Sequence, residues 1–526
     1  MNRNLPDLLH AFVDAADATV FFKSKDIVWD VPQLFAHFSK WASFLSECGV
    51  KRGDRVGIYL KKSLEEIAAT FAISVVGGVF VNIHPGNKFQ QVQHIIDDCD
   101  IAVLISSKER LRALGQSLEA LQVSQIISVD ASDDLAVSRE ILSFRSAEAT
   151  SLPLFPGEKT PRLLDDDIAT ILYTSGSTGK PKGIIQTHGN LMEGAEIVSN
   201  YVQNVPEDRL LSVLPFSFDY GLNQLLSAIY KNFSLVLQDY LFPLDLVKAL
   251  LREQITGLAG VPTIWLDLLK VLDKHPETQL PHLRYITNSG GKMYASTVKK
   301  LRERLPQTDI YLMYGLTEAF RSTFLPPSEV DRRPESIGKA IPNVEIFVIN
   351  DEGKECAPGE VGEIVHRGAL IAKGYWGNPQ KTEQVYRPNP LLPTWLGAAE
   401  KVVYSGDLGW KDEDGFLYIV GRKDNMIKSS GHRISPDEIT EVLLKIDGVS
   451  NAAVVGVEDE HLGHKVVAFL EIDANREISQ RECQFFVKKF LPPHMIPAMV
   501  TCLEKFPKNG NGKVNLKALK TLATNS

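Results

Sequence analysis

The chain has 526 residues, a net charge of −8, and 44% hydrophobic against 23% charged residues. A chain of this length is too long for a single hydrophobic core, because domains average roughly 150 residues. We therefore expect roughly two to four domains. The composition is that of a globular protein, and the acidic balance argues against nucleic-acid binding as the main function. The cysteines (Cys48, Cys99, Cys356, Cys483 and Cys502) form no CxxC pair. This excludes a disulfide framework or a zinc cluster and favours a reducing compartment.

The N-terminal segment lacks the continuous apolar core of a signal peptide. Pro6, His10, Asp14 and Asp17 interrupt it. The sequence has no uncharged apolar run of about 18 residues or more, which a membrane-spanning helix would need. We therefore predict a cytoplasmic protein without a membrane span.

In the first third of the chain, predicted strands alternate with predicted helices. The segment 61–77 has helical spacing. The predicted buried strands are RVGIYL (55–60), GGVFVNIHP (77–85), IAVLIS (101–106) and QIISVD (125–130). Such alternation predicts parallel, doubly wound sheets. The proline-rich, acidic segment 147–167 is expected to be a surface connection.

The alternation resumes with the strand IATILYT (168–174), a glycine-rich loop and a helix from about Asn190. Five further short strands or strand ends follow: LLSVLPFS, SLVLQ, GLAGVP, YITNSG and IYLMYG. From Asn343 short strands with turn signals predominate and helices are expected to vanish, which predicts a small β-rich subdomain. After Arg422 two helices (436–446 and about 481–490) and two strands, NAAVVGV and KVVAFLEI, predict an α+β tail. The predicted class is therefore α/β, with large doubly wound N-terminal sheets, a β-rich subdomain and an α+β C-terminal domain.

The glycine-rich loop is YTSGSTGKPKG, residues 173–183. Glycines let backbone N–H groups approach an anion, hydroxyl groups add donors, and lysines add positive charge. The Walker A spacing fails, because Gly176 and Gly179 are only three residues apart and Pro181 follows Lys180. The kinase pattern GxGxxG fails as well. A linker is disfavoured because the loop directly follows a buried apolar run.

Other motifs follow this loop in a fixed order. They are Tyr314-Gly-Leu-Thr-Glu318, Tyr404-Ser-Gly-Asp407, Gly421-Arg-Lys-Asp424, Ser430-Gly-His-Arg433 and Gly510-Asn-Gly-Lys513. With the loop, they resemble the AMP-forming adenylating enzymes, namely acyl-CoA synthetases, adenylation domains of nonribosomal peptide synthetases, and luciferases. The resemblance spans essentially the whole chain. It implies that ATP activates a carboxylic acid to an acyl-adenylate, which a thiol then attacks. It also implies a large domain (1–422, including the β-rich part 343–422) and a small mobile domain (423–526) hinged at Asp424.

The resemblance assigns roles to the ATP-site residues one by one. Lys182 and the loop would cradle the β- and γ-phosphates; the loop residues are Thr174, Ser175, Gly176, Ser177, Thr178 and Gly179. The adenine side would be formed by Ser289, Gly290, Gly291, Tyr314 and Gly315. Asp407, with Arg422 beside it, would accept the ribose hydroxyls, because an ionised carboxylate offers two acceptor oxygens. Thr317 would touch the α-phosphate, Glu318 would bind Mg²⁺, and Lys513 would bridge the carboxylate and the α-phosphate. Taken singly, Asp407, Glu318 and Lys513 would read as ordinary turn residues.

Transfer to the thiol would use a second face of the C-terminal domain. The resemblance places Asp424 at the hinge, and Lys428, Gly431 and Arg433 on that face. A small residue at Gly431 would let the pantetheine arm pass. Because no enzyme nucleophile is needed, the cysteines are predicted to take no part.

The acid-binding residues are predicted to be Phe218, Asp219, Tyr220, Asn223, Met313 and Arg321. Amino-acid adenylation domains place Phe-Asp where this chain has Phe218-Asp219, and there the aspartate pairs with the α-amino group of the substrate. A buried, unpaired aspartate would cost several kcal/mol. The alternative is that Asp219 binds local amides or caps the following helix. Arg321 could pair a second carboxylate or Asp219 itself. Together they predict a small, polar, amino-bearing acid rather than a long alkyl chain.

The thiol acceptor is either CoA or the phosphopantetheine arm of a separate carrier protein, because no carrier domain follows Lys513. The SGHR segment favours CoA, whereas Asp219 favours a carrier protein. A ligase that stops at the adenylate, or that transfers the acyl group to an amine or a hydroxyl, is an alternative. A degenerate nucleotide-binding protein is another, and the intact motifs argue against it. The resemblance implies a monomer or a dimer.

Overall fold

The N-terminal part of the protein contains a seven-stranded sheet in the order β7-β6-β5-β3-β4-β8-β9. The computed structural model describes residues 4–130, 140–144, 161–175, 181–239, 242–397, 400–429, 432–459, 462–472 and 476–524. The strands are β3 (Arg55–Tyr59), β4 (Val79–Asn82), β5 (Ile101–Ser106), β6 (Gln125–Ser128), β7 (Leu142–Ser143), β8 (Ile168–Ser175) and β9 (Pro181–Thr187). All neighbours are parallel except the hairpin β8–β9. The four strands expected before residue 130 are thus confirmed, whereas 147–160 of the expected surface connection lie outside the described residues.

Helix α3 (Leu64–Val75) shows why this part is doubly wound. The Ser63 side chain accepts a hydrogen bond from the backbone N–H of Glu66 and so caps the helix. From Ile67 to Val75 every residue is buried, which is typical of a helix covered by sheets and helices on all sides. The other helices before the glycine-rich loop are α1 (Leu5–Ala15), α2 (Val31–Glu47), α4 (Phe89–Asp98), α5 (Lys108–Leu114) and the 3₁₀ helix η1 (Gly115–Ala120).

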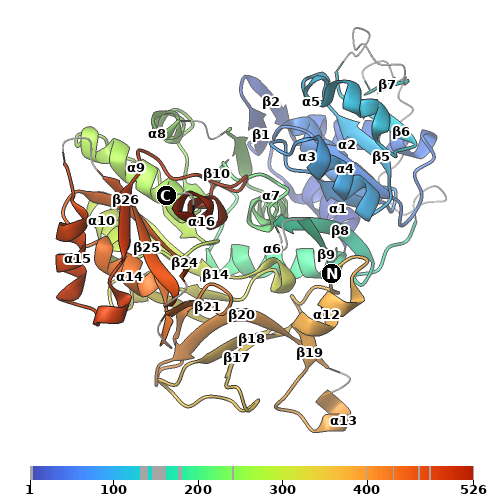
Figure 1. Cartoon of the computed structure of the whole chain (residues 1–526). Helices are drawn as coiled ribbons and strands as arrows, with labels where there is room; N and C mark the ends of the chain where they lie inside the picture. The colour runs from blue at the N-terminus through green and yellow to red at the C-terminus, as the bar shows by residue number, and fades with distance from the viewer. Residues whose placement is uncertain are drawn as a thin grey trace.

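The second sheet has 14 strands. It contains the remaining strands of the large domain (Figure 1). Its parallel part consists of β1 (Phe21–Ser24), β10 (Arg209–Ser212), β11 (Ser234–Leu237), β12 (Gly257–Gly260), β13 (Tyr285–Asn288) and β14 (Asp309–Tyr314), and β2 (Ile27–Asp30) forms the edge. Its antiparallel part consists of β15 (Thr323–Leu325), β16 (Ser336–Ala340), β17 (Val344–Ile349), β18 (Gly362–Gly368), β19 (Tyr386–Pro388), β20 (Lys401–Lys411) and β21 (Leu417–Arg422). The β-rich part is therefore hydrogen-bonded to the parallel sheet through β16.

The expectation that helices vanish after Asn343 is wrong. Helix α12 (Pro379–Val385) and the single turn α13 (Thr394–Gly397) lie in this part. The cause is local, because the Asn378 side chain accepts from the N–H of Lys381 and Pro379 occupies the first turn. In the parallel part, the helices are α6 (His188–Tyr201), α7 (Asp219–Lys231), α8 (Pro243–Arg252), α9 (Pro262–Lys274), α10 (Ala295–Arg304), the 3₁₀ helix η3 (Thr317–Ala319) and α11 (Pro327–Val330).

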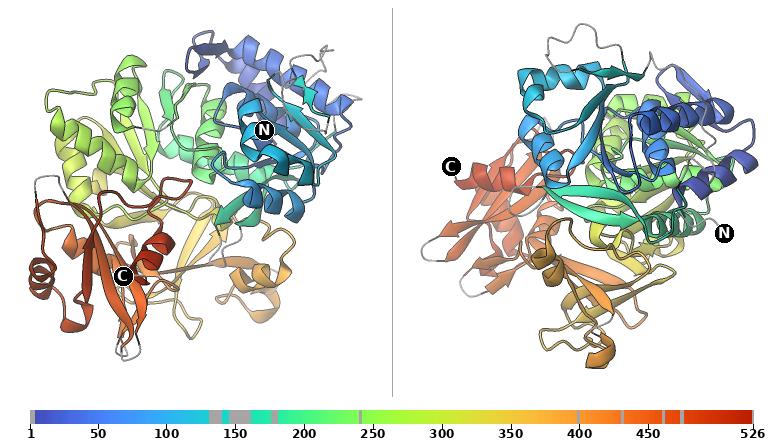
Figure 2. Two further views of the ribbon diagram at one scale, coloured as in Figure 1. Left: turned by 45° about the horizontal axis from the view of Figure 1, so that its top comes forward. Right: turned by 90° about the vertical axis from the view of Figure 1, so that its right-hand side faces the viewer.

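The small C-terminal domain lies on one side of the large part (Figure 2). It contains the hairpin β22 (Ile427–Ser429)–β23 (His432–Ile434) and the sheet β24 (Val449–Asp459)–β25 (Gly463–Ile472)–β26 (Met499–Cys502). Its helices are α14 (Pro436–Leu443), α15 (Gln480–Lys488), the 3₁₀ helix η4 (Pro493–Met495) and α16 (Leu516–Thr524). The segment between β26 and α16 reaches toward the large domain (Figure 1). Among the described residues, no helix is long and apolar enough to cross a membrane.

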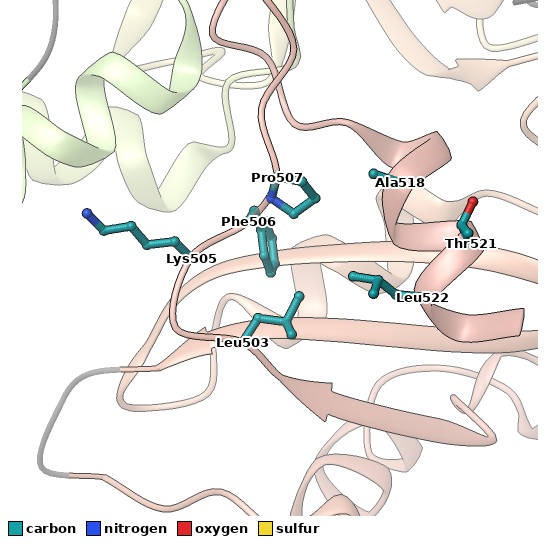
Figure 3. A pocket seen from close by; sticks show the side chains of 7 residues that line it. All are labelled: Leu503, Lys505, Phe506, Pro507, Ala518, Thr521 and Leu522. Carbon is teal, nitrogen blue, oxygen red and sulfur yellow. The ribbon is translucent and has the colours of Figure 1, made fainter. Parts of the chain in front are cut away.

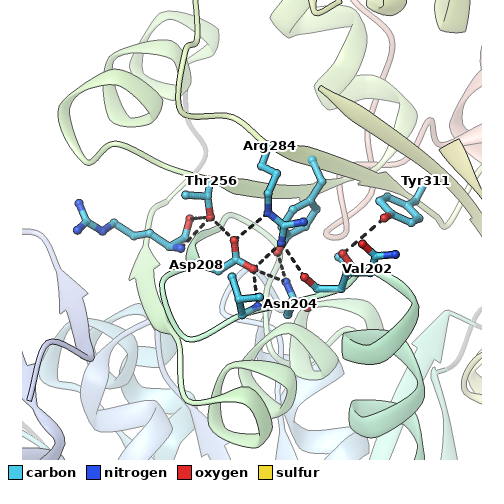
Figure 4. Close-up of polar contacts among 10 residues, drawn as sticks. Val202, Asn204, Asp208, Thr256, Arg284 and Tyr311 are labelled. Atoms are coloured by element: carbon cyan, nitrogen blue, oxygen red, sulfur yellow. Dashed lines mark hydrogen bonds and ion pairs between the residues drawn. The ribbon is translucent and has the colours of Figure 1, made fainter. Parts of the chain in front are cut away.

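The N-terminal ends of the parallel strands are held together by one buried carboxylate, Asp208 (Figure 4). Arg284 Nη2 donates to it at 2.6 Å and Thr256 Oγ1 at 2.8 Å. Asn204 Nδ2 and the backbone N–H of Val205 add bonds of 3.0 Å each. These donors come from the starts of β10, β12 and β13, so Asp208 fixes three strands at the edge opposite their C-terminal ends.

Replacing Asp208 with alanine is expected to lower the free energy of unfolding by about 3 kcal/mol, because buried donors and a guanidinium lose their partner. Chemical denaturation followed by tryptophan fluorescence measures the change. Asp331→Ala removes an exposed carboxylate, which pairs with Arg302 at 3.1 Å, and serves as the control. An equal effect of both replacements would show that Asp208 does not hold the strands.

The C-terminal ends of the same strands position the candidate site. In parallel α/β sheets, ligands bind at these ends. Residues 213–219 follow β10, 261–263 follow β12, 289–291 follow β13, and 315–318 follow β14. The residues that the sequence assigns to ATP and the acid therefore come mainly from one edge of one sheet.

Candidate active site

The side chain of Lys513 extends from the C-terminal domain into the large domain. Its Nζ lies 4.9 Å from the centre of the Phe218 ring. A Cβ added at Gly290 would lie only 2.9 Å from Lys513 Cε and 3.2 Å from Nζ, so the lysine occupies the space that a side chain would fill. Gly290 also has a φ of +79°, which favours glycine. Burial lowers the pKa of Lys513, and the carboxylates of Asp219 and Asp407 oppose this shift.

A tight turn built by Asn509 presents Lys513. Asn509 Oδ1 accepts the backbone N–H of Lys513 at 3.0 Å, and the Asn509 carbonyl accepts the N–H of Gly512 at 2.9 Å. Gly512 has a φ of +77°, a conformation that costs glycine little. The segment NGNGK therefore forms its turn from its own residues.

Asp407 and Arg422 form the candidate ribose site, and Tyr314, which was assigned to the adenine side, contacts it. Tyr314 Oη donates to Asp407 Oδ2 at 2.6 Å, and Arg422 Nη1 lies 3.1 Å from Asp407 Oδ1. Burial raises the pKa of Asp407, while Arg422 and the bond from Tyr314 oppose the shift. Each carboxylate oxygen has two lone pairs, so each retains acceptor capacity for a hydroxyl group. Behind this group lies His366, 3.5 Å from Tyr314 Oη, and burial lowers the pKa of His366 to about 3.

Asp219 and Arg321 form a buried ion pair, with Arg321 Nη1 at 3.7 Å from Asp219 Oδ2 and side chains only 4% and 5% exposed. Thr317 Oγ1 also donates to Asp219 Oδ2, at 3.2 Å. Helix α7 begins at Asp219, and the cap position is occupied by Phe218 without a side-chain capping bond. Asp219 is thus not the N-cap, although its Oδ1 accepts the N–H of Tyr220 at 2.7 Å. Asp219 therefore both accepts a local backbone amide and pairs with Arg321, two of the roles predicted for it.

The guanidinium of Arg321 is held from several sides. It donates to the carbonyls of Phe320 at 2.5 Å and Asp219 at 3.1 Å, and it lies 5.3 Å from the centre of the Tyr220 ring. Phe320 is fully buried with a φ of +34°, an uncommon conformation for a bulky residue. Arg321 Nε and Asn223 Nδ2 are buried and have no hydrogen-bond partner in the described part of the chain. Two buried donors at the candidate acid site therefore lack a hydrogen-bond partner among the described residues.

Glu318 follows β14 in the turn η3. Tyr375 Oη donates to its Oε1 at 2.6 Å, and its backbone carbonyl accepts from Ala372 at 2.9 Å. Gln186 Nε2 binds the carbonyl of Thr317 at 2.6 Å and fixes the turn from β9. No cluster of three or more His, Cys, Asp or Glu side chains that could hold a metal occurs among the described residues. A carboxylate oxygen of this kind fits Mg²⁺ when phosphate oxygens supply the other ligands.

The hairpin β8–β9 carries the glycine-rich loop. Thr174 lies opposite Lys182 in its register, and Ser175 lies opposite Pro181. The loop residues Gly176, Ser177, Thr178 and Gly179, and the side chain of Ser175, lie outside the described residues. The antiparallel pairing nevertheless brings the two arms of the loop together at the edge of the first sheet.

The other predicted residues divide between this site and the C-terminal domain. Ser289, Gly291 and Gly315 lie in the segments that follow β13 and β14, and Met313 Sδ accepts from Tyr201 Oη at 2.8 Å. Asp424 Oδ1 lies 3.3 Å from Arg422 Nε. Lys428 lies opposite Arg433 in the hairpin β22–β23, which packs on β25. Gly431 and the side chain of Arg433 lie outside the described residues. The structure therefore places Phe218, Gly290, Asp219 and Asp407 near Lys513. The described residues among those predicted for thiolation lie in the hairpin β22–β23.

Several residues that hold this site were not predicted from the sequence. Tyr375 and Gln186 hold the turn of Glu318, His366 lies behind Tyr314, and Thr263 and His84 contact the loop of Lys513. None belongs to a motif, and each acts through a contact between segments far apart in the chain. No local signal in the sequence could have identified them.

Comparison with known proteins agrees with this arrangement. The AMP-binding enzyme family matches residues 11–376, and the AMP-binding enzyme C-terminal domain matches residues 438–513. The chain therefore belongs to the AMP-binding enzyme family, the superfamily of adenylating enzymes. It is an AMP-forming adenylating ligase with the expected α/β fold and a small C-terminal domain.

Individual relatives are distant and diverse. The chain is 28% identical to a long-chain-fatty-acid–CoA ligase of Bacillus subtilis, over 90% of this chain and 86% of the relative. It is 29% identical to gramicidin S synthase 2 of Aneurinibacillus migulanus over 94% of this chain, which corresponds to only 10% of the synthase. The structure of o-succinylbenzoate CoA synthetase from Bacillus subtilis with AMP has a TM-score of 0.81 at 26% identity, covering 98% of both chains. The relatives thus include CoA ligases as well as a gramicidin S synthase.

Proposed function

We propose that this ligase activates a small polar carboxylic acid and transfers it to the pantetheine thiol of CoA or of a separate carrier protein. The observation that supports the first step is the position of Lys513. Its side chain passes Gly290 and Phe218 and is close enough to Asp219 and Asp407 for both carboxylates to influence its pKa. One ammonium group can therefore act where the predicted acid and ribose sites meet.

In the first step, a carboxylate oxygen of the acid attacks the α-phosphorus of ATP. The bond to the bridging oxygen breaks, pyrophosphate leaves, and an acyl-adenylate forms. Negative charge accumulates on the equatorial oxygens, and the ammonium group of Lys513 would stabilise it electrostatically. Asp407, oriented by Tyr314 and Arg422, would hold the ribose hydroxyls. A Mg²⁺ ion bound at Glu318 would neutralise phosphate charge.

The ion pair of Asp219 and Arg321 bears on which acid the site accepts. A buried aspartate needs compensation, and Arg321 supplies it within the chain, so an amino group on the substrate is not required for that purpose. The unpartnered donors Arg321 Nε and Asn223 Nδ2 instead favour an acid with a further acceptor group, such as a carbonyl, hydroxyl or carboxylate. An amino acid is the second candidate, which the carboxylate of Asp219 supports. A long alkyl chain would leave these polar atoms buried without partners.

The test is pyrophosphate release against a panel of acids, without any thiol. The panel contains proteinogenic, D- and β-amino acids, hydroxy, keto and dicarboxylic acids, and fatty acids from short to long. We expect the highest kcat/KM with small polar acids and AMP as the nucleotide product once a thiol is added. Preferred turnover of long fatty acids would overturn the proposed substrate class.

One variant and two acceptors complete this test. If amino acids respond and Asp219→Ala abolishes their turnover, the amino-bearing substrate is supported. Equal turnover of amino acids by the wild type and Asp219→Ala would refute it. CoA and a phosphopantetheinylated carrier protein are then offered separately to the enzyme with its accepted acid. Product formation that needs neither thiol would refute the proposed transfer step.

A further inference from the structure

The loop that carries Lys513 begins in the C-terminal domain at Phe506 and Pro507. Figure 3 shows the Phe506 ring pointing toward Leu503 and toward Leu522 of α16. The residues that line this hollow are Leu503, Lys505, Phe506, Pro507, Ala518, Thr521 and Leu522. The backbone N–H of Phe506 donates to Glu471 Oε1 at 2.6 Å. The base of the loop is thus fixed. The position of its tip, which carries Lys513, depends on contacts with the large domain.

One face of helix α9 meets this loop. Thr263, Asp267 and Lys270 are spaced four and three residues apart, which places them on the same face. Thr263 Oγ1 donates to the backbone carbonyl of Gly512, the residue before Lys513, at 2.7 Å. The opposite face of α9 carries Trp265, Leu268 and Leu272, which are buried in the core of the large domain. The helix is therefore a rigid element that presents its polar face to the loop.

Two ion pairs continue along this face. Asp267 Oδ2 lies 3.1 Å from Lys508 Nζ, and Lys270 Nζ lies 3.4 Å from Glu471 Oε2. The lysine side chains are 34% and 44% exposed, so water and salt screen these pairs and they hold the loop only weakly. The bond from Thr263 differs, because Thr263 is buried and its hydroxyl meets the loop directly beside the functional lysine.

A second contact comes from the first sheet. His84 follows β4, and its Nδ1 accepts the N–H of Gly86 at 3.0 Å. The imidazole ring also lies against the backbone of Gly510. A Cβ at Gly510 would lie 2.9 Å from a ring carbon of His84, so glycine is required for this approach. The tip of the loop is therefore held from both sheets of the large domain.

We infer that Thr263 and His84 are positioning residues, which hold the backbone of Gly512 and Gly510 so that Lys513 reaches the acid and the α-phosphate. This inference rests on the proposed role of Lys513 in adenylation. Neither residue touches the reacting atoms. Loss of either contact lets the loop leave the site and carries the ammonium group of Lys513 away with it.

The first experiment does not depend on any substrate. The enzyme is labelled with an amine-reactive reagent, and modification of Lys513 over time is followed by peptide mass spectrometry. Thr263→Val keeps the shape of the side chain but removes the hydroxyl group, and Thr263→Ser keeps the hydroxyl group. We expect Lys513 to be labelled about tenfold faster in Thr263→Val, as expected for one lost buried hydrogen bond. Thr263→Ser should match the wild type, and His84→Ala should resemble Thr263→Val.

Exposed Lys248, whose side chain is 63% exposed, provides the internal reference. Its labelling should be equal in all four proteins, and their melting temperatures should agree. Equal labelling of Lys513 in the wild type and in both Thr263→Val and His84→Ala would overturn the inference. Faster labelling of every lysine in a variant would show general loosening of the fold, which also contradicts it.

The second experiment separates the two half-reactions with the accepted acid. Adenylate formation is measured as pyrophosphate release, and transfer is measured from the synthetic acyl-adenylate and the thiol. We expect Thr263→Val to slow adenylate formation about tenfold, with KM for ATP unchanged and transfer unaffected. An equal loss in both half-reactions would overturn the inference. If no acid on the panel is activated, the proposed function fails, whereas the labelling result still decides whether Thr263 and His84 hold the loop.

Discussion

Replacing Lys513 with alanine is expected to slow adenylate formation by about 10²–10³-fold, the effect of removing one preorganised donor from a developing negative charge. The lysine is the residue of the C-terminal domain that lies against Phe218 and Gly290 of the large domain. Transfer from a supplied acyl-adenylate to the thiol should remain close to that of the wild type. Pyrophosphate release measures the first half-reaction, and thioester formation measures the second.

Lys508→Ala is the matched control for this variant. Lys508 lies in the same loop, but its ammonium group pairs with Asp267 and is 34% exposed. Its removal should change adenylate formation only slightly, because such pairs contribute about 0–1 kcal/mol. If Lys508→Ala and Lys513→Ala slowed both half-reactions equally, the loop would have a structural role, and Lys513 would not be specific to adenylation.

Replacing Arg321 with methionine is expected to lower the free energy of unfolding by about 3–5 kcal/mol, because the Asp219 carboxylate is left buried without its counter-charge. Both side chains are nearly inaccessible, and the only other side-chain donor to Asp219 in the described contacts is Thr317. Denaturation by urea, followed by tryptophan fluorescence, measures the loss.

The double variant Asp219→Asn, Arg321→Met should recover most of this stability, since it removes both charges. Arg302→Met is the matched single control. Arg302 pairs with Asp331 at the surface, with side chains 32% and 67% exposed, so its removal should change stability by less than about 1 kcal/mol. Additive losses in the double variant would show that Asp219 and Arg321 do not compensate each other. Asp219 would then be open to a substrate amino group.

The fold was predictable where a hydrophobic pattern runs through a whole element. The buried strands β3, β5 and β6 and the helix α3 follow from hydrophobic spacing, because one apolar face has to meet a core. Helix α12 was not predicted from the sequence. Its cap at Asn378 is also local, but seven residues among short strands give too weak a periodic pattern.

The connection between the two parts of the large sheet could not be predicted from the sequence. The β-rich part looked like a separate subdomain, yet β16 pairs with β15 on one side and β21 on the other. Strand pairing depends on contacts between segments that lie about 80 residues apart, such as Ser336 and its register partner Tyr418. No pattern within either segment indicates which strand it will meet.

The sequence by itself determined the class of chemistry. The glycine-rich loop, the predicted carboxylates and Lys513 all stand in short motifs. Short motifs act through local backbone geometry, as the turn made by Asn509 for Lys513 shows. Only the tertiary structure decided which partner each charged group has. It paired Asp219 with Arg321 and placed Gly512 against Thr263, 249 residues away. The physical reason is that burial and electrostatic compensation depend on which segments the core brings together, and these are not neighbours in the chain.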